Sequence, residues 1–444
     1  MQIVQPNTRH LKRDLAEAAR GIATALAQSG HRTWIVGGAV RDLALGRAVH
    51  ELDLATDALP DEIEASCPVT IPVGKAFGTV IVVWEGLPVE VTTFRSERGY
   101  SDGRRPDTVE FGATPEEDAR RRDFTCNALF LDPLTGELLD PEGGLADLAE
   151  GHLAAIGDPA ERFREDGLRL MRLARFQARL ELVIEAETEA AARAERGAIE
   201  RISAERIFQE LHKILIAPRA YVAIGLLVEL GVLQLALPAW ARLHGPGRAP
   251  EAAWERRIEA LEWLESDDAA LNFALLFDPL GGDSAQALEA LEALRPSREL
   301  VRSVSAIWSV LDQLEALWPL AESQVERGPD RSARLRILAD PAWKRAKNLA
   351  AAFGDARREE PGTVEGGHLG RNARELESFA HRLTKDDYDP APVLLSADLI
   401  ALGLRPGPRF GQLLVEAREL QLQGELADAD QARAWLAARL SSAE

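Results

Sequence analysis

The spacing of hydrophobic residues changes near residue 150, and this change predicts two kinds of structure in one chain. Before that point, short apolar runs of strand length are separated by turn residues; the runs are Trp34–Val36, Thr79–Trp84, Pro88–Phe94 and Ala128–Asp132. From about Gly151 onward, leucine, alanine, glutamate and arginine recur at helical spacing. The pattern predicts an α/β head with short strands and helices, followed by an all-α remainder.

A glycine pair ends the first predicted strand. The strand Trp34–Val36 is expected to be buried, and Gly37-Gly38 permits a tight turn because neither residue has a Cβ. A helix is expected to begin at this turn and to cover Ala39–Leu45. The free N–H groups at a helix start suit a phosphate group, so this turn is a candidate phosphate site.

Two acidic residues follow at strand spacing. In Glu51-Leu52-Asp53-Leu54, acids and leucines alternate, which places both carboxylates on one face of a strand and both leucines on the other. Two carboxylates beside a triphosphate suit a two-metal site for phosphoryl transfer. Either feature alone is more often an ordinary turn or a solvated face, and it is their closeness in the sequence that favours a function.

Glu90 is a third candidate carboxylate. It lies between Val89 and Val91 on a predicted strand. If that strand neighbours the acidic pair, Glu90 can ligate a metal ion or accept the proton of an attacking hydroxyl. The alternative is a solvated strand glutamate.

Composition narrows the class of protein. The chain has 444 residues, enough for two to four packed units, and its 46% hydrophobic and 28% charged content is that of an ordinary globular protein. Its two cysteines exclude a disulfide framework and a cysteine-rich zinc site. No apolar run reaches the length of a membrane span, and the first 30 residues form a charged amphipathic pattern without a signal-peptide core. We therefore expect a cytoplasmic protein without a membrane partner.

Charge gives two opposing indications. The 52 basic and 72 acidic side chains give a formal net charge of −20, which argues against nucleic-acid binding because phosphate contacts dominate that affinity. A local stripe of arginines argues for it; its members are Arg104, Arg105, Arg120, Arg121, Arg122, Arg162, Arg164, Arg169, Arg172, Arg175 and Arg179. The alternative for each helical arginine is an ion pair with a neighbouring acid.

The glycine turn and the acidic pair together carry a family resemblance. Gly37-Gly38-Ala39-Val40-Arg41-Asp42 with the acids that follow resembles the first motif of class II tRNA nucleotidyltransferases and bacterial poly(A) polymerases, in the polymerase-β-like superfamily. The resemblance implies a head with a small mixed sheet and helices, followed by an all-α neck, body and tail. It also implies that Gly37, Gly38 and Arg41 bind nucleotide and that Glu51 and Asp53 hold catalytic Mg²⁺. Glu51 departs from the family, which usually has aspartate there, and its extra methylene shifts a carboxylate in a site sensitive to about 1 Å.

A second motif follows the predicted head strands. Arg121-Arg122-Asp123-Phe124-Thr125-Cys126-Asn127-Ala128 resembles the family's second motif. Chemically, Arg122 can hold triphosphate oxygens, whereas Asp123 and Asn127 can bond to ribose hydroxyls. The resemblance implies selection of ribonucleotides.

A third motif suggests how the base is chosen. In Glu165-Asp166-Gly167-Leu168-Arg169, we expect a helix that places Asp166 and Arg169 on one face at i,i+3 spacing. The aspartate can accept from the exocyclic amine of C or A, and the arginine can donate to the adjacent ring nitrogen. An ordinary ion pair within the helix is the alternative. The match continues through Arg172 and Arg175, so the resemblance implies that all four residues bind nucleotide.

Four further segments refine the resemblance. The charged loop Gly99–Pro106 is similar to a flexible loop that relatives adding only C have shortened, and Val73–Thr79 resembles the tRNA branch rather than the poly(A) branch. Arg201–Ile207, with a helix-capping Ser203, resembles a neck motif expected to brace the base-reading helix. Residues 395–425 resemble the tail of bacterial members.

We therefore expect four parts: a nucleotidyltransferase head at 1–150, a base-selecting neck at 151–217, a helical body at 218–325 and a tRNA-contacting tail at 326–444. The expected activity is template-independent addition or repair of the 3′-terminal CCA of tRNA from CTP and ATP. An A-adding enzyme and a poly(A) polymerase are the alternatives with the same chemistry. A catalytically weakened RNA-binding relative, motivated by Glu51 and the acidic net charge, is the alternative of another class. The sequence does not specify an oligomeric state.

Overall fold

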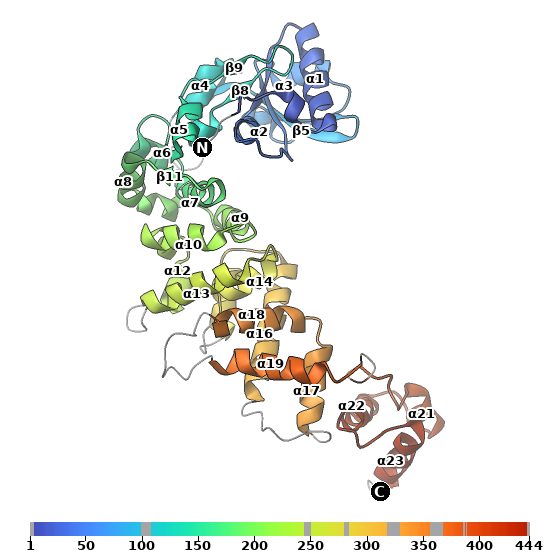
Figure 1. The fold of residues 1–444 in the computed structure, drawn as a ribbon. Coiled ribbons are helices and arrows are strands. Elements are labelled where there is room, and N and C mark those ends of the chain that lie inside the picture. Colours follow the sequence, from blue (N-terminus) through green and yellow to red (C-terminus); the bar gives the residue numbers. More distant parts are fainter. Residues whose placement is uncertain are drawn as a thin grey trace. The chain divides into compact units, whose positions relative to one another are not determined.

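The computed structural model describes residues 4–98, 108–243, 250–278, 284–317, 329–355, 367–384, 387 and 389–441. The chain forms two compact units, Met1–Ala241 and Arg242–Glu444, called here the first and second units (Figure 1). The loop Gly99–Pro106 lies outside the described residues. The expected four-part division remains a prediction, since the structure groups the expected head and neck in one unit.

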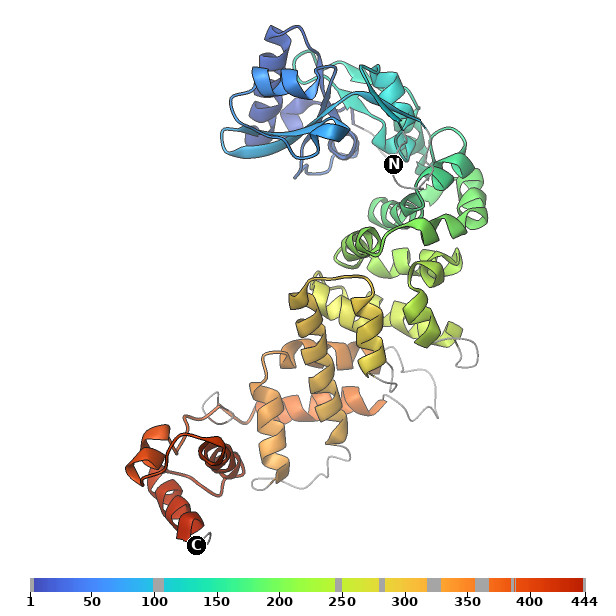
Figure 2. The ribbon, with the colours of Figure 1, turned by 180° about the vertical axis from the view of Figure 1, so that it is seen from behind.

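The first unit is built around a seven-stranded mixed sheet in the order β3-β4-β5-β2-β1-β8-β9. Its strands are β1 (Thr33–Val36), β2 (Asp53–Thr56), β3 (Thr70–Ile71), β4 (Thr79–Trp84), β5 (Leu87–Thr93), β8 (Phe130–Leu131) and β9 (Leu138–Leu139). Only β2 and β5 run parallel among these neighbours; the other pairs are antiparallel. The expected α/β head with a small mixed sheet is confirmed (Figures 1 and 2).

Some strand limits differ from the sequence pattern. β4 has the bounds expected from its apolar run, but β2 begins only at Asp53, so Glu51 precedes the strand. β8 is shorter than the expected strand; at its start, Ala128 closes the 3-10 turn η3 (Thr125–Asn127) with φ −101° and ψ 33°, which is not an extended conformation. A separate antiparallel pair, β6 (Arg95–Arg98) and β7 (Thr108–Phe111), stands outside the main sheet.

The helix α1 (Arg13–Gln28) packs against the sheet. Its apolar residues recur at helical spacing and are buried; they are Leu15, Ala18, Ala19, Ile22, Ala23 and Leu26. A Cβ on Gly21 would lie 2.2 Å from the ring of Trp84 on β4. A residue without a side chain at this point therefore lets helix and strand approach closely.

Helices dominate the rest of the first unit. They are α2 (Gly38–Ala44), α3 (Pro60–Ser66), α4 (Pro115–Arg120), α5 (Gly144–Glu150), α6 (Pro159–Glu165), α7 (Leu168–Leu180), α8 (Ala186–Ala194), α9 (Ala204–Leu215), α10 (Ala220–Glu229) and α11 (Val232–Ala236), with 3-10 turns at η1 (Thr8–His10), η2 (Lys75–Phe77) and η4 (Arg196–Arg201). One short parallel pair, β10 (His152–Leu153) with β11 (Val183–Ile184), interrupts the otherwise helical region. The helix α12 (Pro238–Leu243) spans the boundary of the units.

The described part of the second unit is helical. Its elements are α13 (Pro250–Leu264), α14 (Ala269–Leu276), α15 (Ser284–Glu292), α16 (Arg298–Ala316), α17 (Pro329–Ala339), α18 (Trp343–Asp355), α19 (Gly367–Ala380), α21 (Ser396–Ala401), α22 (Pro408–Leu422) and α23 (Ala429–Ser441). Trp308 donates its indole N–H to the carbonyl of Ala274 at 3.1 Å, which joins α16 to α14 in the core. Across the described ranges, no helix is long and apolar enough to cross a membrane.

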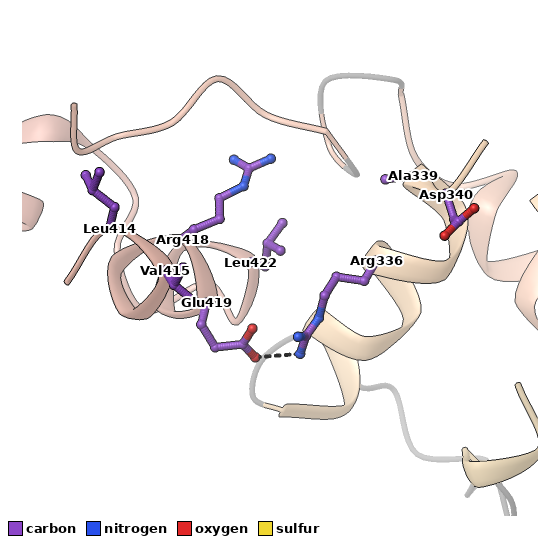
Figure 3. Close-up of a pocket in the computed structure, with 8 residues that line it drawn as sticks. All are labelled: Arg336, Ala339, Asp340, Leu414, Val415, Arg418, Glu419 and Leu422. Atoms are coloured by element: carbon purple, nitrogen blue, oxygen red, sulfur yellow. Dashed lines mark hydrogen bonds and ion pairs between the residues drawn. The ribbon is translucent and has the colours of Figure 1, made fainter. Parts of the chain in front are cut away.

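A pocket of about 430 Å³ lies between α17 and α22 of the second unit (Figure 3). Arg336 and Glu419 face one another across it at 3.0 Å, and Val415 adds an exposed apolar side chain. None of the candidate site residues lines this pocket.

Candidate active site

The turn at Gly37 leads into α2, and the guanidinium of Arg122 lies beside it. Gly37 has φ 64° and ψ −125°, a conformation that residues with a Cβ rarely adopt. A Cβ on Gly37 would lie 3.1 Å from Nη1 of Arg122, so glycine also leaves room for this guanidinium. Arg122 donates to the carbonyl of Asn127 at 3.2 Å and lies 5.0 Å from the ring centre of Phe130. The positively charged group of the second motif thus lies beside the turn of the first.

Three carboxylates gather near this turn. Asp53 on β2 is the register partner of Glu90 on the parallel strand β5. Glu51 comes two residues earlier, and the exposed acids alternate with the buried Leu52 and Leu54, as the sequence predicted. Desolvation by the surrounding protein, then the charges of Glu90 and Glu51, raise the pKa of Asp53 to about 6, and Arg122 opposes this.

The carboxylates fit a metal ion that the substrate would help to ligate. Within the described residues, no three carboxylate, imidazole or thiol groups form a metal site on their own. Mg²⁺ is typically held by one or two carboxylates together with phosphate oxygens, so a complete set of protein ligands is not required. Desolvation and then the neighbouring charges of Glu90 and Glu51 raise the pKa of Asp53, and a divalent cation would favour its ionised form.

Asp123 and Asn127 of the second motif bond to each other. Both are buried, and the amide of Asn127 donates to Oδ1 of Asp123 at 2.9 Å. Oδ2 of Asp123 accepts from Nη2 of Arg172 at 2.6 Å, while the Asn127 oxygen accepts from Arg41 at 2.5 Å. Burial alone would raise the pKa of Asp123, but the Arg172 charge and these hydrogen bonds lower it to about 2. The residues expected to contact ribose are thus tied into a network between α2 and α7.

Three arginines surround one aromatic ring at this network. The guanidinium carbons of Arg41, Arg172 and Arg175 lie 5.3, 5.2 and 4.4 Å from the ring centre of Phe176. Arg175 also forms an ion pair with the buried Glu210 of α9 at 2.5 Å. These contacts gather three of the five arginines expected to bind nucleotide, one from the head and two from the neck.

The expectation that Asp166 and Arg169 lie on one face of a helix is wrong, because Asp166 lies before α7 and only Arg169 is within it. Asp166 precedes α7 in an extended conformation, with φ −144° and ψ 101°, and its carboxylate accepts from the first N–H of α7, on Leu168, at 3.1 Å. An aspartate before a helix is favoured there because it satisfies a free N–H group. Both oxygens of Asp166 also accept from Arg206 of α9, at 3.0 and 2.8 Å.

Arg169 is held separately from Asp166. Its Nη1 donates to Glu165 at 2.7 Å and to the carbonyl of Arg162 at 2.9 Å, and its Nη2 donates to the carbonyl of Arg121 at 2.8 Å. Of the two side chains expected to read the base, Arg169 thus contacts the second motif, whereas Asp166 is held by Arg206 and the start of α7.

Ion pairing neutralises much of the predicted arginine stripe. Acidic partners are present for Arg121, Arg122, Arg162, Arg164, Arg169, Arg172, Arg175 and Arg179. Ser203 stands at the start of α9 as expected, but its side chain makes no capping hydrogen bond. Arg206 of the same motif contacts Asp166 directly.

Sequence reasoning missed Asp118 and Glu210. Asp118 precedes Arg122 by four residues, and this i,i+4 spacing was a usable signal. Glu210 lies 35 residues from Arg175, and no local pattern links them.

Comparison with known proteins identifies the family. Family models described as "Poly A polymerase head domain" and "Probable RNA and SrmB- binding site of polymerase A" match residues 33–154 and 181–243. A CCA-adding enzyme of Limosilactobacillus fermentum is 32% identical over 412 residues, covering 93% of this chain and 94% of the relative. One of Geobacillus thermodenitrificans is 39% identical over 295 residues, covering 66% and 70%.

Solved structures agree with this assignment. The Bacillus stearothermophilus CCA-adding enzyme in complex with CTP matches with a TM-score of 0.71 and 30% identity, covering 97% of this chain and 99% of that one. A Thermotoga maritima CCA-adding enzyme complexed with tRNA matches with a TM-score of 0.62 at 19% identity, which shows the shared fold. With a relative matched over nearly its whole length, the chain belongs to the family of CCA-adding enzymes.

Proposed function

We propose that this protein is a template-independent tRNA nucleotidyltransferase that adds or repairs the 3′-terminal CCA of tRNA from CTP and ATP. The carrying observation is the position of Arg122, which lies beside the Gly37 turn and whose charge opposes the rise in the pKa of Asp53. A triphosphate held by this arginine would lie next to the carboxylates. Membership of the CCA-adding family and the CTP complex of a 30% identical relative support the same activity.

Glu51 and Asp53 are the proposed ligands of Mg²⁺. When bound, the metal ions would supply charge stabilisation for the attacking and leaving oxygens. The 3′ oxygen of the tRNA attacks the α-phosphorus of the nucleotide, and pyrophosphate leaves. Glu90 would accept the hydroxyl proton or complete the ligand set, and its register with Asp53 supports this role.

We propose that the triphosphate and the ribose are bound by the second motif together with the arginines around Phe176. Arg122 would bind phosphate oxygens, together with Gly37 and Gly38 of the turn. The buried Arg41 keeps Asn127 in place at 2.5 Å, so the amide is oriented before a nucleotide arrives. To contact ribose, Asp123 and Asn127 would exchange part of the hydrogen bonding between them for hydrogen bonds to the sugar hydroxyls.

Base selection is assigned to Asp166 and Arg169. An exocyclic amine would donate to Asp166, and Arg169 would donate to the neighbouring ring nitrogen, which suits both C and A. In the structure, the Asp166 carboxylate accepts a hydrogen bond from Arg206, and the Arg169 guanidinium pairs with the carboxylate of Glu165. Arg206 thus supplies the donor that the base amine would supply, and Glu165 supplies the acceptor that the ring nitrogen would supply. A bound base would replace these two partners or share the hydrogen bonds with them.

The remaining assignments extend this proposal. The tail at 326–444 would contact tRNA, Arg172 and Arg175 would contribute to nucleotide binding, and the protein would act in the cytoplasm. A poly(A) polymerase is disfavoured by the segment Val73–Thr79, which resembles the tRNA branch.

The test uses tRNA transcripts that lack CCA, end in CC, or end in CCA. Each is incubated with Mg²⁺ and CTP, ATP or both, and the product ends are sequenced. Ordered addition of C, C and A followed by arrest supports the proposal. Extension of only the CC-ended transcript indicates an A-adding enzyme, and long A tails indicate a poly(A) polymerase. Binding of tRNA without extension indicates a catalytically weakened relative, in which Glu51 no longer supports catalysis.

A further inference from the structure

Asp118 is a fully buried carboxylate that holds two consecutive arginines. It lies on α4 and is 0% exposed. Its Oδ1 accepts from Nε of Arg121 at 2.8 Å, and its Oδ2 accepts from Nη2 of Arg122 at 2.9 Å. Burial would raise the pKa of Asp118, but the charges of Arg122 and Arg121 outweigh it and lower the pKa. The carboxylate is therefore ionised, and its single negative charge offsets part of the two positive charges beside it.

One of these arginines is the proposed triphosphate ligand. Asp118 binds Arg122 through both Nε, at 3.2 Å, and Nη2, at 2.9 Å, which fixes the plane of the guanidinium. The remaining nitrogen, Nη1, points to the Asn127 carbonyl and to the open side of Gly37. Asp118 thus sets the direction in which Arg122 faces the phosphate turn.

The other arginine connects to base selection through its backbone. The carbonyl of Arg121 accepts from Nη2 of Arg169 at 2.8 Å. Because the Arg121 side chain is held by Asp118, the backbone at this point is fixed as well. The same carboxylate also lies 3.5 Å from the backbone nitrogen of Arg95, at the start of β6.

We propose that Asp118 is a positioning residue that sets the triphosphate-holding Arg122 and the base-reading Arg169 in a single geometry. This inference rests on the proposed function, because it gives Asp118 a role only through those two arginines. A negative charge is required at this position, since two adjacent guanidiniums repel one another and their burial needs a compensating carboxylate. Replacing the charge should therefore weaken triphosphate binding and base selection together.

The test compares D118N with D132N, a matched carboxylate of the head. Asp132 is 6% exposed and pairs with Arg32 at 3.4 Å, at the end of β1 away from Gly37. D118N is expected to lower kcat/KM for CTP and ATP by about 10- to 100-fold, mostly through KM, because ground-state binding is lost. D132N should stay within about threefold of the wild type. Equal effects of the two variants would overturn the proposal.

Two further variants separate a positioning role from a structural one. If Asp118 acts through Arg122, adding D118N to R122Q should change CTP affinity by less than about twofold, whereas independent effects would add in full and contradict the proposal. R121Q leaves the Asp118–Arg122 pair in place and should raise addition of wrong bases more than it weakens triphosphate affinity. R122Q should do the reverse. If D118N does not fold, R121Q and R122Q still decide the question.

Nucleotide affinity is measured by calorimetry on the whole protein without tRNA, beside the extension assay. If the wild type binds CTP but extends no tRNA, the proposed function fails while the affinities still test Asp118. If the wild type extends tRNA and D118N binds and selects nucleotides equally well, only the inference about Asp118 fails. If the wild type binds neither nucleotide, both are overturned.

Discussion

Asp123 of the second motif and Arg172 of α7 form an ion pair in which one carboxylate oxygen accepts from Nη2 at 2.6 Å and from Nε at 2.7 Å. The pair joins the sheet-bearing part of the first unit to its helical part. Phe124, next to Asp123, adds an edge-to-face contact with Phe176 of the same helix, with ring centres 5.8 Å apart. The proposed ribose contact and the packing between these parts therefore depend on the same residues.

The Asp123 pair predicts acid sensitivity. Its folded pKa of about 2 lies below the ordinary value of 3.8, so its stabilising effect is complete above about pH 4 and is lost as the pH falls towards 2. D123N should therefore lower the free energy of unfolding at pH 7 by about 2 kcal/mol. Urea unfolding at pH 7, 5 and 3 checks this. The deficit should be equal at pH 7 and 5 and smaller at pH 3; a constant deficit would contradict the assignment.

The cluster of Glu51, Asp53 and Glu90 predicts that replacing the Asp53 carboxylate raises stability and lowers activity. Because its folded pKa is raised from the ordinary value of 3.8 to about 6, the ionised carboxylate destabilises the folded state; the effect is complete above about pH 6, declines between pH 6 and 4, and is absent below that range. In EDTA, D53N should be more stable than the wild type at pH 8, by less than about 1 kcal/mol since the group is exposed, and the difference should shrink at pH 5 and disappear at pH 3. Removing a residue that only hydrogen-bonds to a metal ligand typically costs roughly 10- to 100-fold in activity. Because D53N would remove a ligand itself, its rate of tRNA extension should fall by more than that. Thermal melts and tRNA extension provide the two readouts.

The position of Glu51 predicts that activity depends more on the negative charge of this side chain than on its length. The residue is exposed and lies before β2, so its longer side chain has room to adjust. E51D should keep extension within about tenfold of the wild type, whereas E51Q, which loses an anionic ligand, should raise the Mg²⁺ concentration needed for half-maximal activity. Mg²⁺ titrations of both variants decide this. Equal loss in the two would mean that side-chain length, rather than charge, limits the site.

The sequence predicted the head better than the contacts between its parts. The β4 strand Thr79–Trp84 and the helix after Gly37-Gly38 follow from local periodicity and turn chemistry, and both form close to where they were expected. The Asp166 conformation did not follow, because its bond to Arg206 spans 40 residues. A helix start fixed by such a distant partner leaves no local periodic signal.

A close backbone contact predicts that Gly144 is essential to the second motif. A Cβ there would lie 2.2 Å from the carbonyl oxygen of Thr125, in the turn that carries Asn127. G144A should lower the free energy of unfolding by about 1–3 kcal/mol and weaken CTP binding. G197A is the control, since its Cβ would meet only a side-chain oxygen of Glu200 at 4.0 Å. Calorimetric melts and CTP titrations distinguish the two; equal stability would contradict the contact.

The Arg206–Asp166 pair predicts a variant with poorer base selection. Arg206 binds both oxygens of Asp166 at 3.0 and 2.8 Å, which fixes the carboxylate that would accept the base amine. R206Q removes this hold, so addition of U or G to a tRNA lacking CCA should rise by about tenfold relative to C, equivalent to about 1.4 kcal/mol of lost discrimination.

R193Q is the matched control for R206Q. Arg193 pairs with Glu189 and Glu229, but it is 45% exposed and contacts no candidate site residue. Product ends from competing nucleotides are sequenced for both variants and the wild type. Because exposed pairs contribute little, R193Q should select bases as the wild type does. If R206Q also selects C and A normally while its melting temperature falls, Arg206 supports only the fold, and the orientation of Asp166 must come from its bond to the start of α7.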